Sequence, residues 1–500
     1  MPNTITITAT DGSEVKFVDT IIGAGGMKDV YFSPDKSYVV AFFRDKQDAN
    51  AKDRLQNITS VYRERIFNAV GGNYWKDVYC WPTKIVEYNG KLGLVCPSYQ
   101  QDFFFTIGSA NSDFLGIRGK EKNGKWFASA KHQNRNLAPD EKGNWSNYFQ
   151  ICITISRAVR RLHAAGLAHS DLSFNNVLVA PTLDRACIID IDGLVVPGKF
   201  APDVLGTKEF IAPEVYETKH LKMGDPNRKL PCIATDKHAL AVMIYFYLLF
   251  RDPLDGKKVW DTDENKDEVL KRGKNALFIE NTQNTLNSVR ISDLQPSQLP
   301  QGDPQKIPYT VCGPYLKKLF DRAFIDGLHD PARRPTADEW EQALLKTVDL
   351  MQPCQNPKCW HKWFVFDNTT KPKCPFCGTE YKGILPVLNL YSSRRAGAFT
   401  ADDYRLMVYN NQYQYLYQWH VNRNISPNEK LTDEQKKPVG HFVFHQNKWS
   451  LVNERLADLE DKTENKEIPL NQAVELTDGK KILLSKEEGG RLIIVQLVKN

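Results

Sequence analysis

The spacing of apolar and polar positions changes several times along the chain, and each change predicts a different element. Residues 4–18 alternate on both sides of an Asp-Gly pair, which predicts a β-hairpin. The run 38–44 predicts a strand, and residues 51–69 and 147–165 carry apolar positions at helical spacing. The unbroken apolar run 239–250 predicts a buried helix, because it is too short to cross a bilayer.

Two residues are expected to mark the ends of the helix at 147–165. Ser146 is expected to cap its first turn, and Gly166 is expected to end it. The preceding segment, 106–146, is rich in Gly, Asn, Lys and Ser and has weak periodicity. It predicts a loop-bearing insertion, to which the sequence assigns no chemistry.

The last part of the chain, residues 384–500, predicts an all-β domain. Strand-like runs alternate there with turn signals such as Asn410-Asn411 and Asp478-Gly479. The expected strands are 405–409, 413–419, 441–444, 449–452, 481–484 and 492–498.

Composition narrows the class of protein. A chain of 500 residues exceeds what one hydrophobic core serves, so we expect about two to four domains. With 41% apolar and 25% charged residues, the chain is typical of soluble globular proteins. The net charge of +6 is small and the basic residues are dispersed, which does not favour binding to nucleic acid. We expect no signal peptide, no membrane segment and a cytoplasmic location. Six scattered cysteines are expected to be reduced core residues: Cys80, Cys96, Cys152, Cys187, Cys232 and Cys312.

Candidate chemistry gathers between residues 169 and 193. Asp171 stands two residues after a His, Asn176 five residues after that acid, and Asp190 about fourteen residues further on. One carboxylate can orient an attacking hydroxyl, while an amide and a second carboxylate can hold Mg²⁺ against a triphosphate. We therefore expect Asp171 to be the catalytic acceptor and Asn176 and Asp190 to bind Mg²⁺, with Asp192 as the alternative acid.

Further motifs resemble those of protein kinases over roughly residues 15–348. Residues 206–214 match the segment G-T-x-x-[YF]-x-A-P-E, and residues 330–335 match D-P-x-x-R-P. Small-molecule kinases lack both motifs, so the resemblance implies a protein substrate. It also implies a structural ion pair between Arg334 and Glu214.

This resemblance implies a fold class for most of the chain. We expect an α+β bilobal protein kinase fold over residues 1–350, with an N-lobe of about 1–97 and a C-lobe of about 98–350. A zinc ribbon at 351–383 and an all-β sandwich at 384–500 are expected to follow.

The strand at 38–44 lacks the lysine with which protein kinases bind the ATP phosphates, because its slot falls on Ala41 or Phe43. Lys28 instead occupies the third-glycine position of the glycine-rich turn. The sequence from residue 23 to 31 resembles the glycine-rich loop of the with-no-lysine kinases, which has the pattern G-x-G-x-x-K-x-V-Y. This resemblance implies that Lys28 is the catalytic lysine. Two alternatives remain open: Lys28 is a solvated turn lysine, or the chain is a pseudokinase.

The same resemblance implies a site for ATP. Glycines of the turn would approach the phosphates and Val30 would cover the adenine. Glu64 would orient the lysine, unless it lies on an exposed helix face, and residues 92–99 would run into a hinge. The expected nucleotide-binding residues are Gly23, Gly25, Gly26, Lys28, Val30, Glu64, Cys96, Pro97, Tyr99, Asn176, Asp190 and Asp192.

The catalytic region also departs from the kinase pattern. Ser170 replaces the usual Arg, and residues 194–205 contain no Ser, Thr or Tyr. We therefore expect activity that does not depend on phosphorylation of that segment. Ser173 replaces the Lys typical of Ser/Thr kinases, which leaves the hydroxyl specificity open.

Four cysteines are clustered after the kinase-like region. Cys354, Cys359, Cys374 and Cys377 have the spacing of a zinc ribbon. A module of about thirty residues is too small to hold a core without metal. We expect structural Zn²⁺, because four thiolates leave no open coordination position, with an iron–sulfur cluster as the alternative.

The strands expected at 384–500 resemble a forkhead-associated sandwich. Arg423 and His441 are imperfect candidates for the phosphothreonine-binding pair of that family. Kinase, ribbon and sandwich in this order resemble the bacterial kinases of tellurite-resistance-associated signalling triads. That resemblance implies two partners, a von Willebrand A-type protein and a metal-dependent protein phosphatase.

Two functions are compatible with these motifs. The first is an ATP- and Mg²⁺-dependent Ser/Thr protein kinase that also phosphorylates itself. The alternative is a pseudokinase scaffold, which binds nucleotide or partners without phosphoryl transfer.

Overall fold

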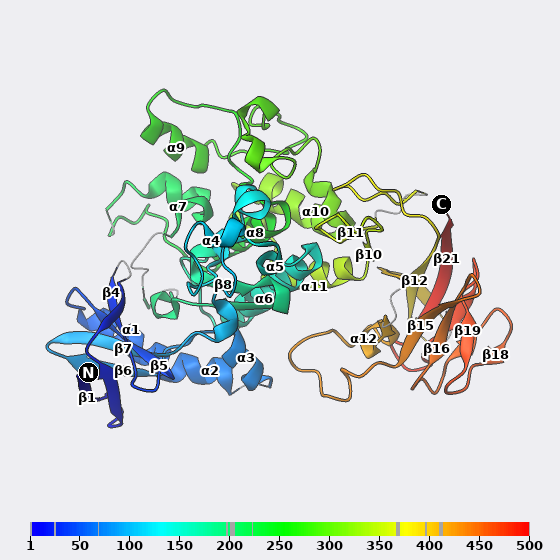
Figure 1. The fold of residues 1–500 in the computed structure, drawn as a ribbon, viewed down its shortest axis with the longest axis horizontal. Coiled ribbons are helices and arrows are strands. Elements are labelled where there is room, and N and C mark those ends of the chain that lie inside the picture. The colour runs from blue at the N-terminus through cyan, green and yellow to red at the C-terminus, as the bar shows by residue number, and fades with distance from the viewer. Residues whose placement is uncertain are drawn as a thin grey trace. The chain divides into compact units, whose positions relative to one another are not determined.

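The computed structural model describes residues 3–24, 27–68, 70–196, 199–200, 206–222, 224–366, 371–395, 398–409 and 414–499 (Figure 1). The chain divides into two compact units. The first contains residues 1–143, 147–309 and 318–341, and the second contains residues 144–146, 310–317 and 342–500. The expected separation of ribbon and sandwich within the second unit stays a prediction.

The first unit begins with the predicted hairpin, followed by a five-stranded antiparallel sheet in the order β3-β4-β5-β7-β6. The hairpin consists of β1 (Thr4–Thr8) and β2 (Glu14–Val18). The sheet consists of β3 (Ile21–Ala24), β4 (Lys28–Phe32), β5 (Tyr38–Phe43), β6 (Lys84–Tyr88) and β7 (Lys91–Pro97). Because side chains alternate along a strand, Val40 and Phe42 of β5 pack with Phe17 of the hairpin, while Phe43 faces the other way.

A helical stretch covers the face of the sheet that carries Phe43. It consists of α1 (Ala49–Asn57), a π turn at 58–62 and α2 (Arg63–Phe67), which matches the helix predicted at 51–69. Asp48 caps α1 by accepting a hydrogen bond of 2.7 Å from the backbone N–H of Ala51. Leu55 of α1 packs with Phe43 in the same hydrophobic cluster. A further helix, α3 (Gly72–Val78), was not predicted.

The rest of the first unit is mainly helical. Its regular elements are α4 (Ala110–Asp113), α5 (Pro139–Lys142), β8 (Val177–Ala180), β9 (Arg185–Ile188), α7 (Pro213–Thr218), α8 (Ile233–Leu249) and α9 (Glu264–Arg272). Three further helices have residues in both units: α6 (Trp145–Ala164), α10 (Gly313–Asp321) and α11 (Ala337–Val348). Helix α8 confirms the buried helix predicted at 239–250, since it is apolar around its whole circumference. Within the described residues, no helix is both long enough and apolar enough to span a bilayer.

The start of α6 differs from the prediction. The helix begins at Trp145, so Ser146 lies inside its first turn. Asn144 accepts a hydrogen bond of 3.0 Å from the backbone N–H of Ser146 and takes the capping position. Gly166 follows the helix with φ of +76°, as expected for a residue that ends a helix.

The segment predicted as a loop-bearing insertion is tightly packed. Besides α4 and α5 it contains short helical turns at 124–126 and 132–136. Lys122 and Glu141 form a buried ion pair of 2.9 Å, and Glu141 also accepts hydrogen bonds from the backbone N–H groups of Ile107 and Gly108. Internal polar contacts, which leave no periodic signal in the sequence, therefore order this segment.

The second unit contains two antiparallel sheets and a shorter strand pair. The sheets have the orders β13-β12-β21-β20-β17-β18 and β14-β15-β16-β19, and β10 pairs with β11. The strands are β10 (Met351–Pro353), β11 (Trp363–Val365), β12 (Ile384–Arg395), β13 (Ala398–Met407), β14 (Tyr415–Leu416), β15 (Gly440–His445), β16 (Lys448–Asn453), β17 (Glu460–Asp461), β18 (Lys466–Glu467), β19 (Ala473–Glu475), β20 (Lys481–Leu483) and β21 (Arg491–Lys499). One hydrophobic core takes side chains from both sheets, including Leu388, Leu451 and Ile493.

In this unit one strand prediction was wrong and one long strand was not predicted. The strand expected at 413–419 is reduced to β14, and a helical turn, α12 (Gln418–Val421), follows it. The long strand β12 was missed, although it pairs with both β13 and β21. The forkhead-associated character of the sandwich stays a prediction.

Candidate functional site

A buried carboxylate fixes the loop that carries Asp171. Asp236, in the first turn of α8, accepts hydrogen bonds from the backbone N–H groups of His169 (2.7 Å) and Ser170 (3.2 Å). The imidazole Nε2 of His169 lies 3.0 Å from the carbonyl oxygen of Ile189, which ties the loop to the end of β9. Ser170 has φ of +68°, a left-handed conformation that these contacts hold in place.

The side chains of Asp171 and Asn176 meet directly. The Asn176 amide donates to the backbone carbonyl (2.8 Å) and to Oδ2 (2.9 Å) of Asp171. The second carboxylate oxygen, Oδ1, accepts from the backbone N–H (2.7 Å) and the hydroxyl (2.9 Å) of Thr207. The sequence predicted the segment around Thr207 but not this contact, which positions the Asp171 carboxylate. Thr207 Oγ1 also lies 3.0 Å from Ser173 Oγ.

Lys28 reaches the two acids at the other side of the site. Its Nζ lies 2.7 Å from both carboxylate oxygens of Asp192 and 3.3 Å from Oδ1 of Asp190. Lys28 begins β4 opposite Phe43 in β5, and cross-strand partners project from the same face of a sheet. The ammonium group lies 5.2 Å from the centre of the Phe43 ring. The structure thus places Lys28 beside Phe43, one of the two positions at which the strand lysine of protein kinases was expected.

Lys28, Asp190 and Asp192 shift one another's pKa values. Burial alone would lower the pKa of Lys28, but the negative charges of Asp192 and Asp190 outweigh it and raise that pKa above its ordinary value. Burial opposes ionisation of Asp192, but Lys28 lowers the pKa of this carboxyl below its usual range. Burial and then the charge of Asp192 raise the pKa of Asp190. At neutral pH, Lys28 is therefore cationic and Asp192 is anionic.

The two acids differ in exposure. The Asp190 side chain is 52% exposed and the Asp192 side chain 14% exposed. Asp190 has φ of +59° and lies farther from the ammonium group than Asp192 does. Asp190 is thus the more accessible ligand for a cation, and Asp192 is the main partner of Lys28.

The structure does not bring Glu64 to Lys28. Ile58, Tyr62 and Ile66 are buried at intervals of four residues, so Glu64 lies on the opposite side of the helix and is exposed. Within the described part of the chain, the carboxylates that contact Lys28 are those of Asp190 and Asp192.

The expected adenine-binding residues lie near the end of β7. Cys96 pairs with Val39 across the sheet, and Pro97 ends the strand. Burial raises the pKa values of the Cys96 thiol and the Tyr99 phenol, so both side chains are neutral. Val30 is half-buried in β4, and Gly23 is exposed opposite it in β3. Gly25 and Gly26 lie outside the described residues, as do 197–198 and 201–205 of the segment expected to lack phosphorylation sites.

The predicted ion pair between Arg334 and Glu214 is confirmed. Its two hydrogen bonds are parallel, with Nη1–Oε1 at 2.8 Å and Nη2–Oε2 at 2.7 Å. The same guanidinium donates to the carbonyl oxygens of Gly327, Leu328 and Ala234. One buried cation therefore joins the end of the motif at 206–214 to two other segments of the lobe.

Replacing Arg334 with alanine is expected to lower the free energy of unfolding of the first unit by about 3 kcal/mol, because Glu214 and three carbonyl groups lose their partner. Differential scanning calorimetry would measure the loss. Arg333→Ala is the matched control, since its side chain is 57% exposed and contacts Asp326 at the surface, so a change within about 0.5 kcal/mol is expected. Equal effects of the two substitutions would contradict the structural role of Arg334.

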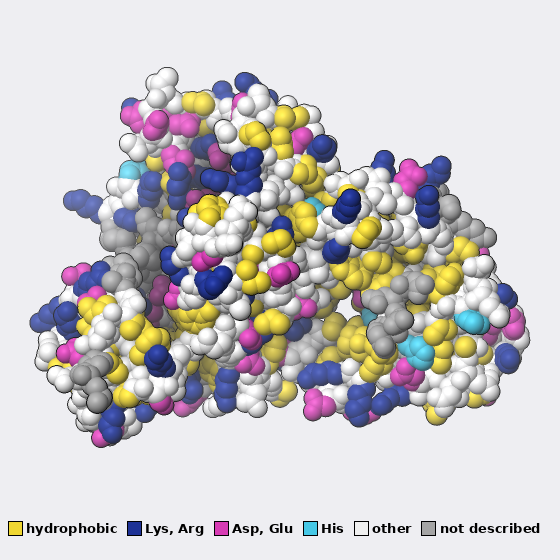
Figure 2. Space-filling view, viewed as in Figure 1, with side chains coloured by type: hydrophobic (Ala, Val, Ile, Leu, Met, Phe, Trp, Pro, Cys, Tyr) yellow, Lys and Arg dark blue, Asp and Glu magenta, His cyan; other side chains and the backbone are white. Residues whose placement is uncertain are grey.

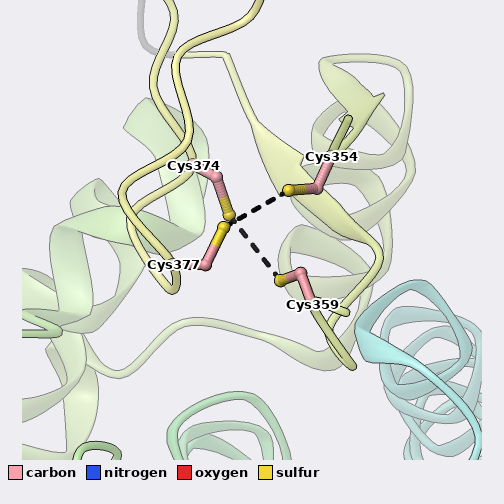
Figure 3. Close-up of side chains that lie close together, drawn as sticks. All are labelled: Cys354, Cys359, Cys374 and Cys377. Atoms are coloured by element: carbon pink, nitrogen blue, oxygen red, sulfur yellow. Dashed lines mark hydrogen bonds between the residues drawn. The ribbon is translucent and has the colours of Figure 1, made fainter. Parts of the chain in front are cut away.

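The four clustered cysteines converge on one point (Figure 3). All their sulfur atoms lie within 4.8 Å of one another. Two of the separations are 3.5 Å (Cys354–Cys377) and 4.0 Å (Cys359–Cys374). A tetrahedral zinc–thiolate centre places its sulfur atoms about 3.8 Å apart. The donor set and its spacing fit a Zn²⁺ ion, and the group can bind such a metal.

Local backbone structure positions these thiols. Cys354 and Cys359 lie in the connection between β10 and β11, where the backbone N–H of Cys354 donates to the carbonyl of Lys362 (2.7 Å). Cys374 and Cys377 lie on a tight turn closed by a hydrogen bond from Gly378 N–H to Cys374 O (2.9 Å). Gly378 has φ of +74°, a conformation that favours glycine.

Purified chain is expected to contain about one Zn²⁺, and Cys374→Ser is expected to lose it, because the remaining three thiolates leave an open position. Elemental analysis would measure the metal, and limited proteolysis would detect unfolding of residues 351–383. Cys232→Ser is the matched control, because this cysteine stands before α8, where serine is a favoured cap. Full metal content in Cys374→Ser would refute the assignment.

Arg423 and His441, the imperfect phosphothreonine-binding candidates, are engaged by acids of their own unit. Arg423 Nη1 lies 3.1 Å from Ser392 Oγ and 3.8 Å from Asp402 Oδ1. His441 Nδ1 lies 2.6 Å from Glu454 Oε1. Each of the two side chains therefore already has a polar partner within the unit.

Comparison with known proteins gives one partial match. No protein-family model matches the chain. The chain is 32% identical over 116 residues to the death-associated protein kinase dapk-1 of Caenorhabditis elegans. The matched stretch covers 23% of this chain and 7% of that protein, so the chain spans a small part of its relative. The match indicates a distant relationship to protein kinases.

Proposed function

We propose that the chain is an ATP- and Mg²⁺-dependent Ser/Thr protein kinase whose phosphate-binding lysine is Lys28. The observation that carries this proposal is the placement of the Lys28 ammonium against Asp192 and Asp190, although no strand lysine is present. The contact between Asp171 and Asn176 and the partial match to a protein kinase support it.

Each residue of the site has a role in this proposal. Lys28 binds a phosphate oxygen of ATP, and Asp171 orients the substrate hydroxyl and accepts its proton. Asn176 and Asp190 would hold Mg²⁺, which supplies charge neutralisation to the phosphates when bound. Thr207 and Asn176 keep the Asp171 carboxylate oriented.

One observation favours the alternative, a pseudokinase scaffold. The Lys28 ammonium contacts both acids of the site, so the groups that would bind phosphate and metal are bound to each other. A chain that keeps this arrangement in the presence of ATP would bind partners without transferring phosphate.

The remaining parts of the chain fit a signalling role in this proposal. The cysteine cluster and the sandwich would dock protein partners of a cytoplasmic bacterial triad, namely a von Willebrand A-type protein and a metal-dependent phosphatase. The domain order resembles the kinases of such triads, and this resemblance is the support for these partners.

Incubating the purified chain with labelled ATP and Mg²⁺ tests the function. Phosphate incorporation into the chain or a general protein substrate is expected, and chelation of Mg²⁺ should remove it. The same chain carrying Asp171→Asn, prepared identically, gives the background from contaminating kinases. Nucleotide binding without any transfer, with Mg²⁺ or Mn²⁺, would refute the kinase and favour the scaffold.

A further inference from the structure

A large cavity of the first unit opens beside the catalytic loop. Its volume is about 530 Å³, and aromatic side chains that include Phe174, Phe246 and Phe250 line part of it. Phe174 stands three residues after Asp171, and Glu209, also in the lining, stands two residues after Thr207, which contacts Asp171. A substrate segment with its hydroxyl at Asp171 therefore passes within a few residues of this cavity.

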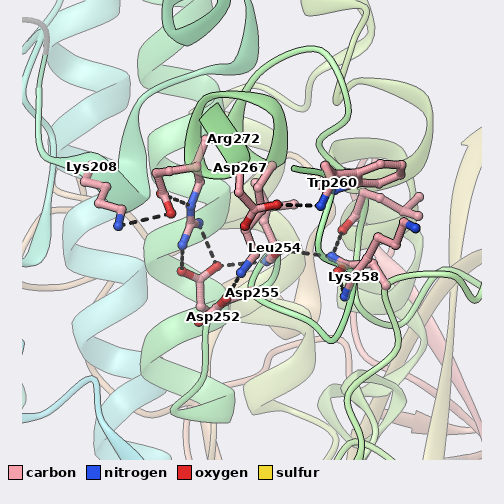
Figure 4. Close-up of polar contacts among 12 residues, drawn as sticks. Lys208, Asp252, Leu254, Asp255, Lys258, Trp260, Asp267 and Arg272 are labelled. Carbon is pink, nitrogen blue, oxygen red and sulfur yellow. Dashed lines mark hydrogen bonds and ion pairs between the residues drawn. The ribbon is translucent and has the colours of Figure 1, made fainter. Parts of the chain in front are cut away.

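Two acids of the cavity are neutralised by cations of α9 (Figure 4). Arg272, itself buried, donates to both carboxylate oxygens of Asp252 at 3.0 and 2.7 Å. Lys271 forms an ion pair with Asp255. The backbone N–H of Leu254 adds a further donor to Asp252 at 2.8 Å. These acids therefore contribute little net negative charge to the cavity.

Three cations of the lining have no ion pair within the part of the chain that the structure describes: Lys125, Lys257 and Arg290. The Lys125 ammonium lies 5.9 Å from the centre of the Phe174 ring, next to the catalytic loop. Of the lining acids, Glu209 and Asp293 alone lack an ion pair among the described residues, so positive charge is in excess. On the face shown in Figure 2, Lys and Arg side chains gather around a hollow below α9.

A further basic group of the lining, the imidazole of His132, is uncharged. Burial, and then the charges of Lys131 and Lys125, lower the pKa of His132, so its imidazole is neutral at neutral pH. Its ring packs against Trp126 with centroids 4.8 Å apart. The unpaired cations of the cavity are therefore Lys125, Lys257 and Arg290, whose long side chains suit contact with a charged group that enters from solvent.

We propose that this cavity binds an anionic side chain of the protein substrate, a carboxylate or a phosphorylated hydroxyl, a few residues from the hydroxyl that is phosphorylated. The proposal rests on the proposed kinase function and names its substrate class. Lys125, beside Phe174, and Arg290, on the exposed side of the cavity, are the specificity-determining cations.

Peptides that scan one position at a time around a central Ser would test this. At each position, Glu, phosphoserine, Gln and Lys are compared, so that carboxylate and phosphate are distinguished. Initial rates give kcat/KM, and fluorescence anisotropy of the labelled peptides on the full chain without ATP gives affinity independently of catalysis. At one or two positions, Glu or phosphoserine is expected to improve both quantities about tenfold over Gln.

Charge-reversal variants locate the effect. Lys125→Glu and, separately, Arg290→Glu are expected to remove the preference for anionic peptides and to favour Lys at the same position. Lys306→Glu is the matched control, because this exposed lysine of the same unit does not line the cavity. Thermal unfolding of each variant shows whether it is folded, and either folded variant is sufficient.

The outcomes separate this proposal from the proposed function. If the chain transfers no phosphate but binds anionic peptides in a manner that depends on Lys125 or Arg290, the kinase proposal fails and the cavity assignment holds. If Glu and phosphoserine bind no better than Gln at every position, or the preference survives both charge reversals, the cavity assignment is overturned.

Discussion

Replacing Asp171 with asparagine is expected to lower the rate of phosphate transfer by about 10²- to 10⁴-fold, because the amide cannot accept the proton of the substrate hydroxyl. The loop should keep its structure. The asparagine carbonyl can still accept the hydrogen bonds of Thr207, and the Asn176 NH₂ group can still donate to the backbone carbonyl of residue 171. Affinity for ATP is therefore expected to change by no more than about threefold.

Initial rates at saturating ATP and equilibrium binding of a fluorescent ATP analogue would measure the two quantities. Asp184→Asn is the matched control, because this exposed acid in the turn between β8 and β9 has φ of +57°, which asparagine tolerates. Its rate should equal that of the wild type. An Asp171→Asn chain that keeps its full rate would exclude Asp171 as the catalytic acceptor.

Replacing Lys28 with alanine is expected to lower phosphate transfer by about 10²-fold or more, since one charged contact to the transferring phosphates is lost. The effect should include a higher KM for ATP, because no other cation contacts Asp190 or Asp192 within the described residues. The substitution also removes the charge that lowers the pKa of Asp192, so this carboxyl becomes easier to protonate.

Lys91→Ala, an exposed lysine at the start of β7, is the matched control and should retain activity. Thermal unfolding of both variants would show whether a lost rate reflects chemistry or folding. Full activity in a folded Lys28→Ala chain would refute the relocated lysine. A cation from another part of the chain would then have to bind the ATP phosphates near Phe43.

Much of the candidate site could be predicted because its residues are close in sequence or follow a fixed order. Asp171 and Asn176 are five residues apart on one loop, so the sequence could group them, and the structure adds their direct contact. Lys28 could be singled out because the strand at 38–44 offers no lysine, and the structure places it opposite Phe43.

The misses have physical causes that spacing does not reveal. The exposure of Glu64 depends on which side of the helix faces the sheet, and the buried positions 58, 62 and 66 decide it. The bond from Thr207 to Asp171 joins groups 36 residues apart. The cations of the cavity come from three distant segments, so no local pattern marks them.

In the second unit, the misses concern local signals that tertiary structure overrode. Pro386 within β12 argues against a central strand, yet it lies at the end of β12 where pairing with β13 has not begun. The aromatic run at 413–419 has high strand propensity, but its last residues form the helical turn α12 instead.

In the proposed kinase, the ion pairs of Lys28 link nucleotide binding thermodynamically to metal binding. Lys28 must leave Asp192 to reach a phosphate, and this exposes a carboxylate pair whose mutual repulsion is relieved by a divalent cation. ATP added alone has to take the Lys28 ammonium away from both acids, and Mg²⁺ added alone has to bind Asp190 beside that ammonium group. Titrations of the two are therefore expected to show positive cooperativity, and because linkage is reciprocal, each ligand should raise the affinity for the other by the same factor.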